Sequence, residues 1–308
     1  MRSHLFNFFK LILLFLPKEF ETYLALLLSK IVGKEIGIIQ WALVLRIKKN
    51  HILESEDFNL LVPPRDKFWA DPHAIKHKDK YFIFIEEYSY LKRKGHISVI
   101  VISPEGIISK PTKIIDKPYH MSYPFVFQSG DKYYMVPETS KSRRIELYVC
   151  LDFPISWEYC RALMEKVEAV DSTLLNKDGK WWLFTSIKSS HYKSLDSNLH
   201  IFSSDKIESS DWQAHKDNPF LSDDNSSRSG GHIFRNKGEL FRPTQNCNRG
   251  YGKGIHLNLI KELNQQSYSE KRFASSRLLK KIHGLHTVNF CDELQIFDVA
   301  KNRHDFYK

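Results

Sequence analysis

The hydrophobic positions of this chain fall into short runs separated by polar turns, and one arrangement of runs and turns occurs five times. The repeated unit starts near residues 71, 123, 171, 230 and 284, so successive starts are 52, 48, 59 and 54 residues apart. In each unit a short apolar run ends in a turn rich in Gly, Asp, Asn or Lys, and a second, more aromatic run follows. This pattern predicts an antiparallel β-hairpin in every unit.

Further strand-like runs lie between the hairpins and begin at His96, Ile145, Asn198 and Ile255. Each unit therefore holds about four strands, and four-stranded units that pack radially into a closed ring form a β-propeller. The repeats lack a helical period, which excludes a helical solenoid. We predict an all-β fold, a five-bladed β-propeller over residues 36–308. The β-branched run Ile36–Ile47 is expected to begin or to close this body.

A short amphipathic helical extension is predicted for residues 1–35. Its two apolar runs, Leu5–Leu16 and Tyr23–Val32, are shorter than the ~20 residues that span a bilayer. No small-residue cleavage site follows the first run, so a signal peptide is not indicated. Lysines border both runs, which suits helices lying on an anionic membrane surface; packing against the body or a partner subunit is the alternative. We expect a cytoplasmic protein, with the inner face of the membrane as the place of any peripheral attachment.

The charge balance and the cysteines restrict the function classes. The chain has 46 Lys and Arg against 36 Asp and Glu, a net charge of +10, which attracts anionic headgroups or phosphorylated substrates; a solvated basic surface explains it equally well. The basic residues are dispersed and match no nucleic-acid module, so no nucleic-acid partner is expected. The four cysteines contain no CxxC pair, so neither a zinc site nor a disulfide framework is indicated. No GxGxxG or P-loop occurs, and no cofactor is predicted.

Propeller geometry brings polar residues of distant segments together. The innermost strand of each blade starts at one face of the central channel, so the residues at these strand starts converge. The expected converging set is Asp71, Tyr123, Asp171, Gly230 and Gly284, with His73, His232 and His286 two residues inward. The ends of the second strands give an outer set, Glu86, Glu87, Glu138, Ser186 and Gln245. Of the neighbours Glu86 and Glu87, only one can face inward, because adjacent strand residues point in opposite directions.

Several segments resemble a known family. The run FWADPHAIKHKDKYFIFIEE, from Phe68, resembles the first blade of glycoside hydrolase family 43. The ordered series WADP, EE, HMSYPFVF, VPET, WWLF and RPTQ is similar to the N-terminal domain of plant glucosamine inositolphosphorylceramide transferases and of its bacterial stand-alone relatives, from about Phe68 to His286. The resemblance implies a sugar-binding five-bladed propeller.

The resemblance also implies roles for two aspartates. Asp71 matches the general base of the hydrolase family, and Asp171 matches the second Asp, which orients the acid. The blade-four glutamate that acts as general acid is missing, because Ser229 stands at its position. Ordinary glycosides need a protonated leaving oxygen, whereas a nucleotide leaving group needs cations and hydrogen bonds instead. Arg228, Arg242 and Arg249 lie near this position in the sequence.

We therefore expect a glycosyltransferase-like enzyme of surface-polysaccharide or glycolipid assembly, with Asp71 as base and a sugar substrate carried by a nucleotide-activated donor. One alternative is a family 43-like hydrolase that uses Glu138 or Glu87 as acid, and another is a non-catalytic sugar-binding module. The predicted catalytic residues are Asp71, Asp171 and Glu138. The predicted substrate-binding residues are Trp69, His73, Glu87, His120, Tyr123, Arg228, His232, Arg242, Gln245 and His286. His120, His232 and His286 form no HxH or HxxxH pair, so no metal site is predicted.

Overall fold

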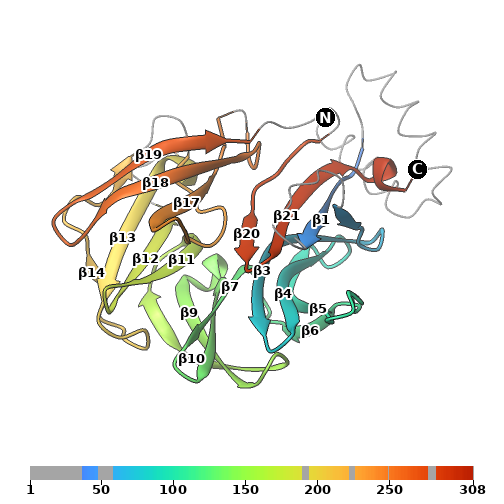
Figure 1. Cartoon of the computed structure of the whole chain (residues 1–308), viewed down its shortest axis with the longest axis horizontal. Helices are drawn as coiled ribbons and strands as arrows, with labels where there is room; N and C mark the ends of the chain where they lie inside the picture. The colour runs from blue at the N-terminus through green and yellow to red at the C-terminus, as the bar shows by residue number, and fades with distance from the viewer. Residues whose placement is uncertain are drawn as a thin grey trace.

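The computed structural model describes residues 37–47, 58–188, 194–221, 226–248, 250–276 and 282–307. These residues form five antiparallel sheets arranged around a centre, each a propeller blade. In Figure 1 the chain passes from blade to blade around this centre, from cyan through green and yellow to red. The predicted five-bladed, all-β fold is confirmed. The predicted helical extension and its boundary at residue 35 lie outside the described residues.

Each hairpin of the sequence repeat forms the inner half of one blade. Blade 1 consists of β3 (Lys67–His77), β4 (Lys80–Ser89), β5 (Lys94–Ile102) and β6 (Thr112–Ile115). Blade 2 consists of β7 (Ser122–Ser129), β8 (Lys132–Glu138), β9 (Arg144–Asp152) and β10 (Ser156–Glu165). Blade 3 consists of β11 (Ala169–Lys177), β12 (Lys180–Ile187), β13 (Asn198–Ser204) and β14 (Gln213–Ala214), with β15 (Phe220–Leu221) beside β13. Blade 4 consists of β16 (Phe234–Asn236), β17 (Glu239–Gln245), β18 (Ile255–Leu263) and β19 (Tyr268–Ser275).

Blade 5 closes the ring with strands from both ends of the described chain. It consists of β20 (Val288–Cys291), β21 (Leu294–Asn302), β1 (Ile39–Ile47) and β2 (Asn59–Leu61). β1 pairs antiparallel with β21 along its whole length, from Ile39 opposite Asn302 to Ile47 opposite Leu294. Figure 1 shows the blue β1 beside the red β21. β1 therefore closes the body, one of the two roles expected for the run that contains it.

Helical structure is confined to three short 3₁₀ turns among the described residues. These are η1 (Ser140–Ser142), η2 (Leu195–Ser197) and η3 (Arg303–Phe306). No helix in the described ranges is long and apolar enough to cross a membrane.

A bulge recurs at the start of the innermost strand in three blades. The register with the second strand shifts between Ala70 and His73, and likewise between residues 122 and 125 and between residues 170 and 173. The bulge residues Asp71, Tyr123 and Asp171 have φ values of 52°, 43° and 50°. Non-glycine residues rarely adopt this left-handed conformation, and bulges re-aim side chains next to functional sites. Here the bulge is repeated at the positions that the sequence predicts to converge.

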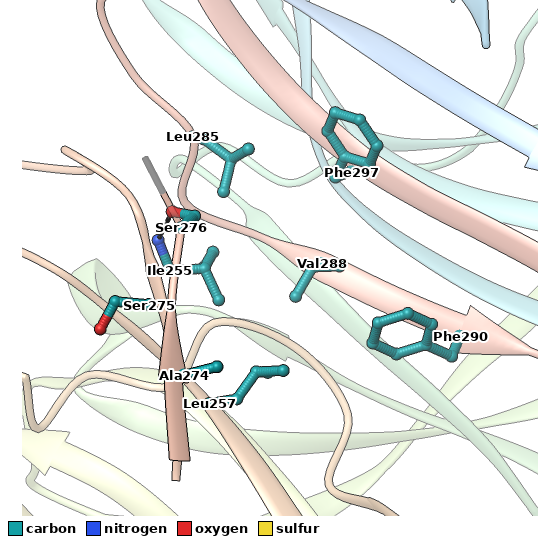
Figure 2. A pocket seen from close by; sticks show the side chains of 9 residues that line it. All are labelled: Ile255, Leu257, Ala274, Ser275, Ser276, Leu285, Val288, Phe290 and Phe297. Carbon is teal, nitrogen blue, oxygen red and sulfur yellow. Dashed lines mark hydrogen bonds between the residues drawn. The ribbon is translucent and has the colours of Figure 1, made fainter. Parts of the chain in front are cut away.

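Apolar side chains fill four of the five seams between blades. Buried clusters join blades 1 and 2, 2 and 3, 3 and 4, and 5 and 1. The seam between blades 4 and 5 instead holds an apolar cavity of about 310 Å³. Figure 2 shows Ile255, Leu257 and Ala274 facing Val288, Phe290 and Phe297 across this cavity. Where the same two blades meet closely, Gly231 has a φ of 135°, and a Cβ atom there would lie 1.9 Å from the Val288 carbonyl oxygen.

Candidate active site

Asp71 lies at the centre of a buried hydrogen-bond network that joins three blades. Its Oδ2 accepts the backbone N–H of Tyr123 at 3.1 Å, and its Oδ1 accepts the Thr287 hydroxyl at 2.8 Å. The side chain of Asp71 is 6% exposed. The backbone N–H of Asp71 in turn donates to Asp298 Oδ2 at 3.0 Å. Blades 5, 1 and 2 are therefore linked through one carboxylate.

The recurring bulge explains how these carboxylates are held. At each bulge, a carboxylate of the preceding blade accepts the backbone N–H of the left-handed residue. Asp298 accepts from Asp71, Asp71 accepts from Tyr123, and Glu138 Oε2 accepts from the N–H of Asp171 at 3.3 Å. Charge-assisted bonds to backbone N–H groups are stronger than neutral ones. The same contacts that join the blades therefore fix acidic groups around the centre.

Asp171 anchors a second part of the site. Its Oδ2 accepts from Arg228 Nε at 2.8 Å and Nη2 at 2.7 Å, and from the Gln245 amide at 2.8 Å. Arg228 also lies 3.6 Å from Asp196 Oδ1, and its guanidinium covers the Tyr251 ring at 4.9 Å. The side chains of Arg228 and Asp171 are 12% and 4% exposed. The charge of this arginine is thus already compensated by two carboxylates.

The central carboxyl groups perturb one another. Burial raises the pKa of Asp71 to about 6; Asp171 and Asp298 add to this, whereas His286 and Thr287 oppose it. Burial and the charge of Asp171 raise the pKa of Glu138 well above its ordinary value, against the opposing effect of Arg228. Burial and the charges of Asp71 and Glu138 raise the pKa of Glu86 in the same way. The structure thus brings together Asp71 and Asp171 of the expected converging set and Glu138 and Glu86 of the expected outer set.

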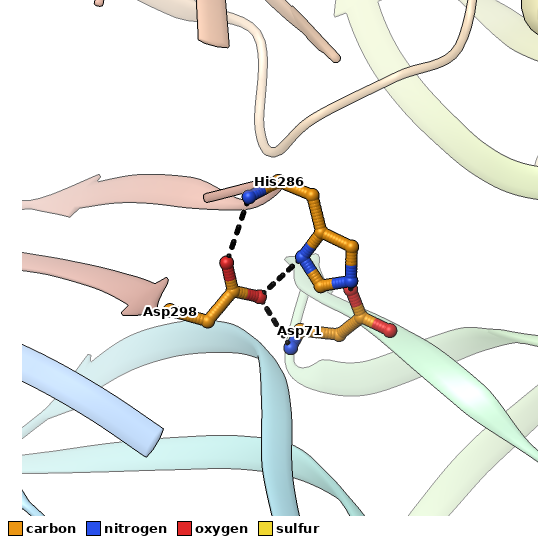
Figure 3. Close-up of side chains that lie close together, drawn as sticks. All are labelled: Asp71, His286 and Asp298. Carbon is orange, nitrogen blue, oxygen red and sulfur yellow. Dashed lines mark hydrogen bonds and ion pairs between the residues drawn. The ribbon is translucent and has the colours of Figure 1, made fainter. Parts of the chain in front are cut away.

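His286 and Asp298 form an ion pair beside Asp71 (Figure 3). His286 Nδ1 lies 2.6 Å from Asp298 Oδ2, and Nε2 lies 3.7 Å from Asp71 Oδ1. Ligand atoms of these three residues lie within 4.8 Å of one another, a spacing at which they could share a metal ion. However, Asp298 already accepts the backbone N–H groups of Asp71, His286 and Thr287 in addition to the imidazole. The arrangement is that of a hydrogen-bonded ion pair, so we assign no metal to it.

A second layer of side chains lies two residues further along the inner strands. The His73 ring lies 4.9 Å from the His232 ring and meets Tyr123 and Phe125 edge-on; His232 stacks on Phe125 at 4.3 Å. The Tyr123 hydroxyl bonds Thr173 at 2.8 Å and accepts the N–H of Gly231 at 2.9 Å. Burial lowers the pKa of His232 to about 4 and that of His73 well below its ordinary value. These predicted binding residues therefore pack as a neutral aromatic layer across the channel.

Three other predicted binding residues have well-defined partners away from Asp71. Glu87 pairs with Lys67 and His96 and accepts from Ser98; burial would raise its pKa, but these bonds lower it to about 2. The structure thus places Glu86, and not Glu87, among the central carboxyl groups, because the two residues alternate along β4. Arg242 forms a two-point ion pair with Glu270, and Trp69 packs in the core between blades 5 and 1.

His120 lies at the edge of the central group. Its Nε2 is 3.5 Å from Glu86 Oε1, and its Nδ1 accepts the N–H of Gly95 at 2.9 Å. Burial, helped by Lys141, lowers the pKa of His120 to about 4. The imidazole is therefore neutral and serves Glu86 as a polar neighbour rather than as a charge partner.

Four residues of the central group were not among the predicted site residues: Glu86, Asp298, Trp41 and Tyr251. Trp41 stacks on the His286 ring at 4.1 Å, and Tyr251 meets the same ring edge-on at 5.2 Å. Asp298 carries a usable signal, since it is a lone acidic residue inside the apolar run of β21. Trp41 and Tyr251 carry none, because an aromatic residue in a strand or loop has no period that indicates its partners.

Comparison with known proteins places this geometry in a family. The model of the family described as "Glucosamine inositolphosphorylceramide transferase 1, N-terminal" matches residues 57–290. The chain belongs to this family. Proteins named glucosamine inositolphosphorylceramide transferase 1 are 34% identical over 206 residues in Oryza sativa subsp. japonica and 32% identical over 207 residues in Arabidopsis thaliana. In each case the match covers 66% of this chain but 27% of the relative, so the chain spans about a quarter of the length of these plant proteins.

Solved structures share the fold at much lower identity. An exo-β-1,3-galactanase from Clostridium thermocellum aligns over 80% of this chain and 55% of its own, with a TM-score of 0.55 and 10% identity. The catalytic domain of a family 62 α-L-arabinofuranosidase from Coprinopsis cinerea aligns over 85% of this chain and 97% of its own, with a TM-score of 0.53 and 7% identity. These likenesses show the fold alone. Both predicted resemblances, to the transferase family and to the hydrolase propellers, are confirmed.

Proposed function

We propose that this chain is a carbohydrate-active enzyme that transfers a glycosyl group to a hydroxyl oxygen, with Asp71 as the base and Glu138 as the acid. The observation that carries the proposal is the shared environment of these two carboxyl groups. Asp71 accepts two hydrogen bonds and lies 3.7 Å from His286, contacts that favour its ionised form. Burial and the charge of Asp171 raise the pKa of Glu138 well above its ordinary value and so favour its protonated form. Pairs of carboxyl groups with separated pKa values are how enzymes assign a base and an acid.

The chemistry requires this difference. At neutral pH an Asp71 with a pKa of about 6 is mostly ionised and can accept a proton from an attacking hydroxyl. The raised pKa of Glu138 favours its protonated form, which can donate a proton to the departing glycosidic oxygen. Glu138 is partly exposed, whereas Glu86, whose pKa is also raised, is 5% exposed. Glu138 is thus the better placed of the two to reach a substrate, and it would replace the acid that is missing at Ser229.

The ion pairs of Arg228 and Arg242 indicate which class of sugar donor the site suits. A nucleotide leaving group needs free cations, but Arg228 is held by Asp171 and Asp196, and Arg242 is held by Glu270. Arg249 lies outside the described residues. The site therefore suits a glycoside donor, whose leaving oxygen needs a proton, better than the nucleotide-activated donor expected from the sequence. Glu87 is excluded as the acid by its lowered pKa of about 2.

The acceptor class follows from the family rather than from the site. The relatives are named glucosamine inositolphosphorylceramide transferase 1, which supports transfer of a sugar in glycolipid or surface-polysaccharide assembly. The chain spans about a quarter of the length of those proteins. The activity in their names is therefore proposed for this chain and is not assigned to it on similarity alone. Transfer from a nucleotide-activated donor remains a second candidate, which the word transferase in these names favours.

The test begins with a screen of aryl glycosides, oligosaccharides and nucleotide-sugars, scored for released phenol, sugar or nucleotide. The proposal predicts turnover of a glycoside. On that glycoside, Glu138→Gln is expected to lower kcat/KM by about 10²–10⁴-fold when the leaving group is a sugar alcohol. The loss should be small for a dinitrophenyl leaving group, which departs without a proton. Nucleotide release alone would support the second candidate, and sugar binding without any turnover would support a binding module.

A matched control is available on the same strand pair. Glu146 on β9 is buried and accepts the hydroxyl groups of Tyr119 and Tyr148, away from the central group. Glu146→Gln is expected to change turnover equally for good and poor leaving groups. A leaving-group dependence in Glu146→Gln as strong as that in Glu138→Gln would contradict the assignment of the acid.

A further inference from the structure

The His286 ring is held in one orientation by contacts on every side. Trp41 stacks on it with ring planes 16° apart, and Tyr251 closes against it edge-on. Two glycines make this packing possible: a Cβ on Gly252 would lie 3.1 Å from the His286 Cβ, and one on Gly284 would lie 2.6 Å from the Trp41 ring. Since Nδ1 is bound to Asp298, Nε2 has to point toward Asp71. Figure 3 shows this order, with the imidazole between the two carboxylates.

Apart from His286, the Tyr123 N–H and the Thr287 hydroxyl, the surroundings of Asp71 favour its protonated form over the carboxylate. Seven titratable groups from the five blades interact electrostatically with Asp71. They are Asp298 and His286 of blade 5, Asp171 of blade 3, Glu86 of blade 1, Tyr123 and Glu138 of blade 2, and Tyr251 of the loop before β18 in blade 4. His286 is the one member of this group that carries a positive charge. Burial alone would lower the pKa of His286, but Asp298 and Asp71 raise it to about 9.

We propose that the Asp298–His286 pair is the positioning device of the base: it holds a positive charge 3.7 Å from Asp71 and so keeps the Asp71 carboxylate ionised and aimed into the centre at neutral pH. The inference rests on the proposed role of Asp71 as the base. His286 does not itself touch the reacting atoms in this account. No proton needs to pass between the three residues, because the imidazolium acts through its charge and through the orientation that Asp298 gives it.

The sign of the effect follows from the neighbours. His286 lowers the pKa of Asp71 and the remaining carboxyl groups raise it. Replacing His286 by Gln removes the lowering charge, so the pKa of Asp71 rises above its value of about 6 and a larger fraction of the base is protonated at neutral pH. Each unit of such a rise beyond the assay pH reduces the ionised fraction about tenfold. Turnover of His286→Gln should therefore fall about fivefold or more at pH 6, where Asp71 of the unaltered protein is about half ionised, and recover as the pH is raised.

The experiment measures the pH profile of kcat/KM and the ¹³C carboxyl titration of Asp71 in the full chain, the Asp71 signal being assigned by its loss in Asp71→Asn. In His286→Gln both the acid limb and the NMR titration are expected to move upward by at least one pH unit. His77→Gln is the control, because His77 lies at the far end of β3, bonded to Tyr133. A uniform loss of activity without a shift would indicate a merely structural role and would overturn the inference.

The two readouts separate this inference from the proposed function. If the Asp71 titration moves but no glycoside is turned over, the proposed function fails and the electrostatic role of the pair stands. If the titration of Asp71 does not move, the inference fails whatever the activity. Should His286→Gln not fold, ¹⁵N spectra of the unaltered protein decide: the His286 ring is expected to carry two protons at pH 8, and a neutral ring at pH 7 would overturn the proposal.

Discussion

The destabilising effect of Gly231→Ala can be estimated directly from the geometry around Gly231. An added Cβ would lie 1.9 Å from the Val288 carbonyl oxygen, where real Cβ contacts essentially never fall below 3.0 Å. The oxygen belongs to β20, so this backbone would have to move by roughly 1 Å. The movement would also strain the bond from the Val288 N–H to the Gly230 carbonyl, now 2.8 Å. β20 directly follows Thr287 and His286, which contact Asp71.

The magnitude has two parts. The backbone conformation, with a φ of 135°, costs about 1–3 kcal/mol for a residue with a side chain. The displaced strand and its weakened hydrogen bond add about 1–3 kcal/mol. Gly238→Ala is the matched control, because Gly238 has a φ of 83° and open space around its missing Cβ. It carries the conformational part without the collision, so Gly231→Ala should be less stable than Gly238→Ala by about 2 kcal/mol.

The assay is urea unfolding followed by tryptophan fluorescence, with kcat/KM measured on the folded fraction. Gly231→Ala is expected to lower the midpoint well below that of Gly238→Ala and to lower turnover in addition. Equal midpoints for the two variants would refute the steric argument. Unchanged turnover in a destabilised Gly231→Ala would refute the link between β20 and the position of Thr287 and His286.

Three further predictions concern buried polar groups. Arg228→Met should lower the free energy of unfolding by about 3–5 kcal/mol, because it leaves Asp171 buried without its cation; Arg228→Lys should recover part of this in the same urea assay. Glu87→Gln should cost about 2 kcal/mol at pH 7. The pKa of Glu87 is lowered to about 2, so its contribution to stability is fully present above its ordinary pKa near 4.5 and disappears as the pH falls through about 2. The difference in unfolding free energy between Glu87→Gln and the unaltered protein should therefore shrink over this pH range. Tyr123→Phe should cost about 1–3 kcal/mol, because it leaves the N–H of Gly231 without an acceptor; differential scanning calorimetry that shows no loss would contradict this.

The fold was predictable because its information is local. Each hairpin is encoded by two short runs and a turn, and five copies leave little choice but a closed ring of blades. The pairing of β1 with β21 was only one of two roles foreseen for residues 36–47, because it joins segments about 250 residues apart and no local pattern specifies that partner.

The site was predictable only in part, because strand parity decides which side chains converge. Asp71 and Asp171 were found from their positions at strand starts. The choice between Glu86 and Glu87 depends on the exact register between β3 and β4, and the bulge at Asp71 shifts that register in a way the sequence does not reveal. Arg242 was expected to bind substrate because it is near Ser229 in the sequence, but its position on β17 points it to Glu270, whereas Gln245 faces Asp171.

The central claim is that Asp71 performs the chemistry of a sugar site at the middle of the ring. Its most direct test is to measure turnover and sugar affinity together in Asp71→Asn, after urea unfolding has shown that the variant is folded. We predict that kcat/KM falls by at least about 10³-fold while the Kd for the sugar changes by no more than a few-fold. Unchanged turnover and unchanged affinity in a folded Asp71→Asn protein would contradict the assignment of the site.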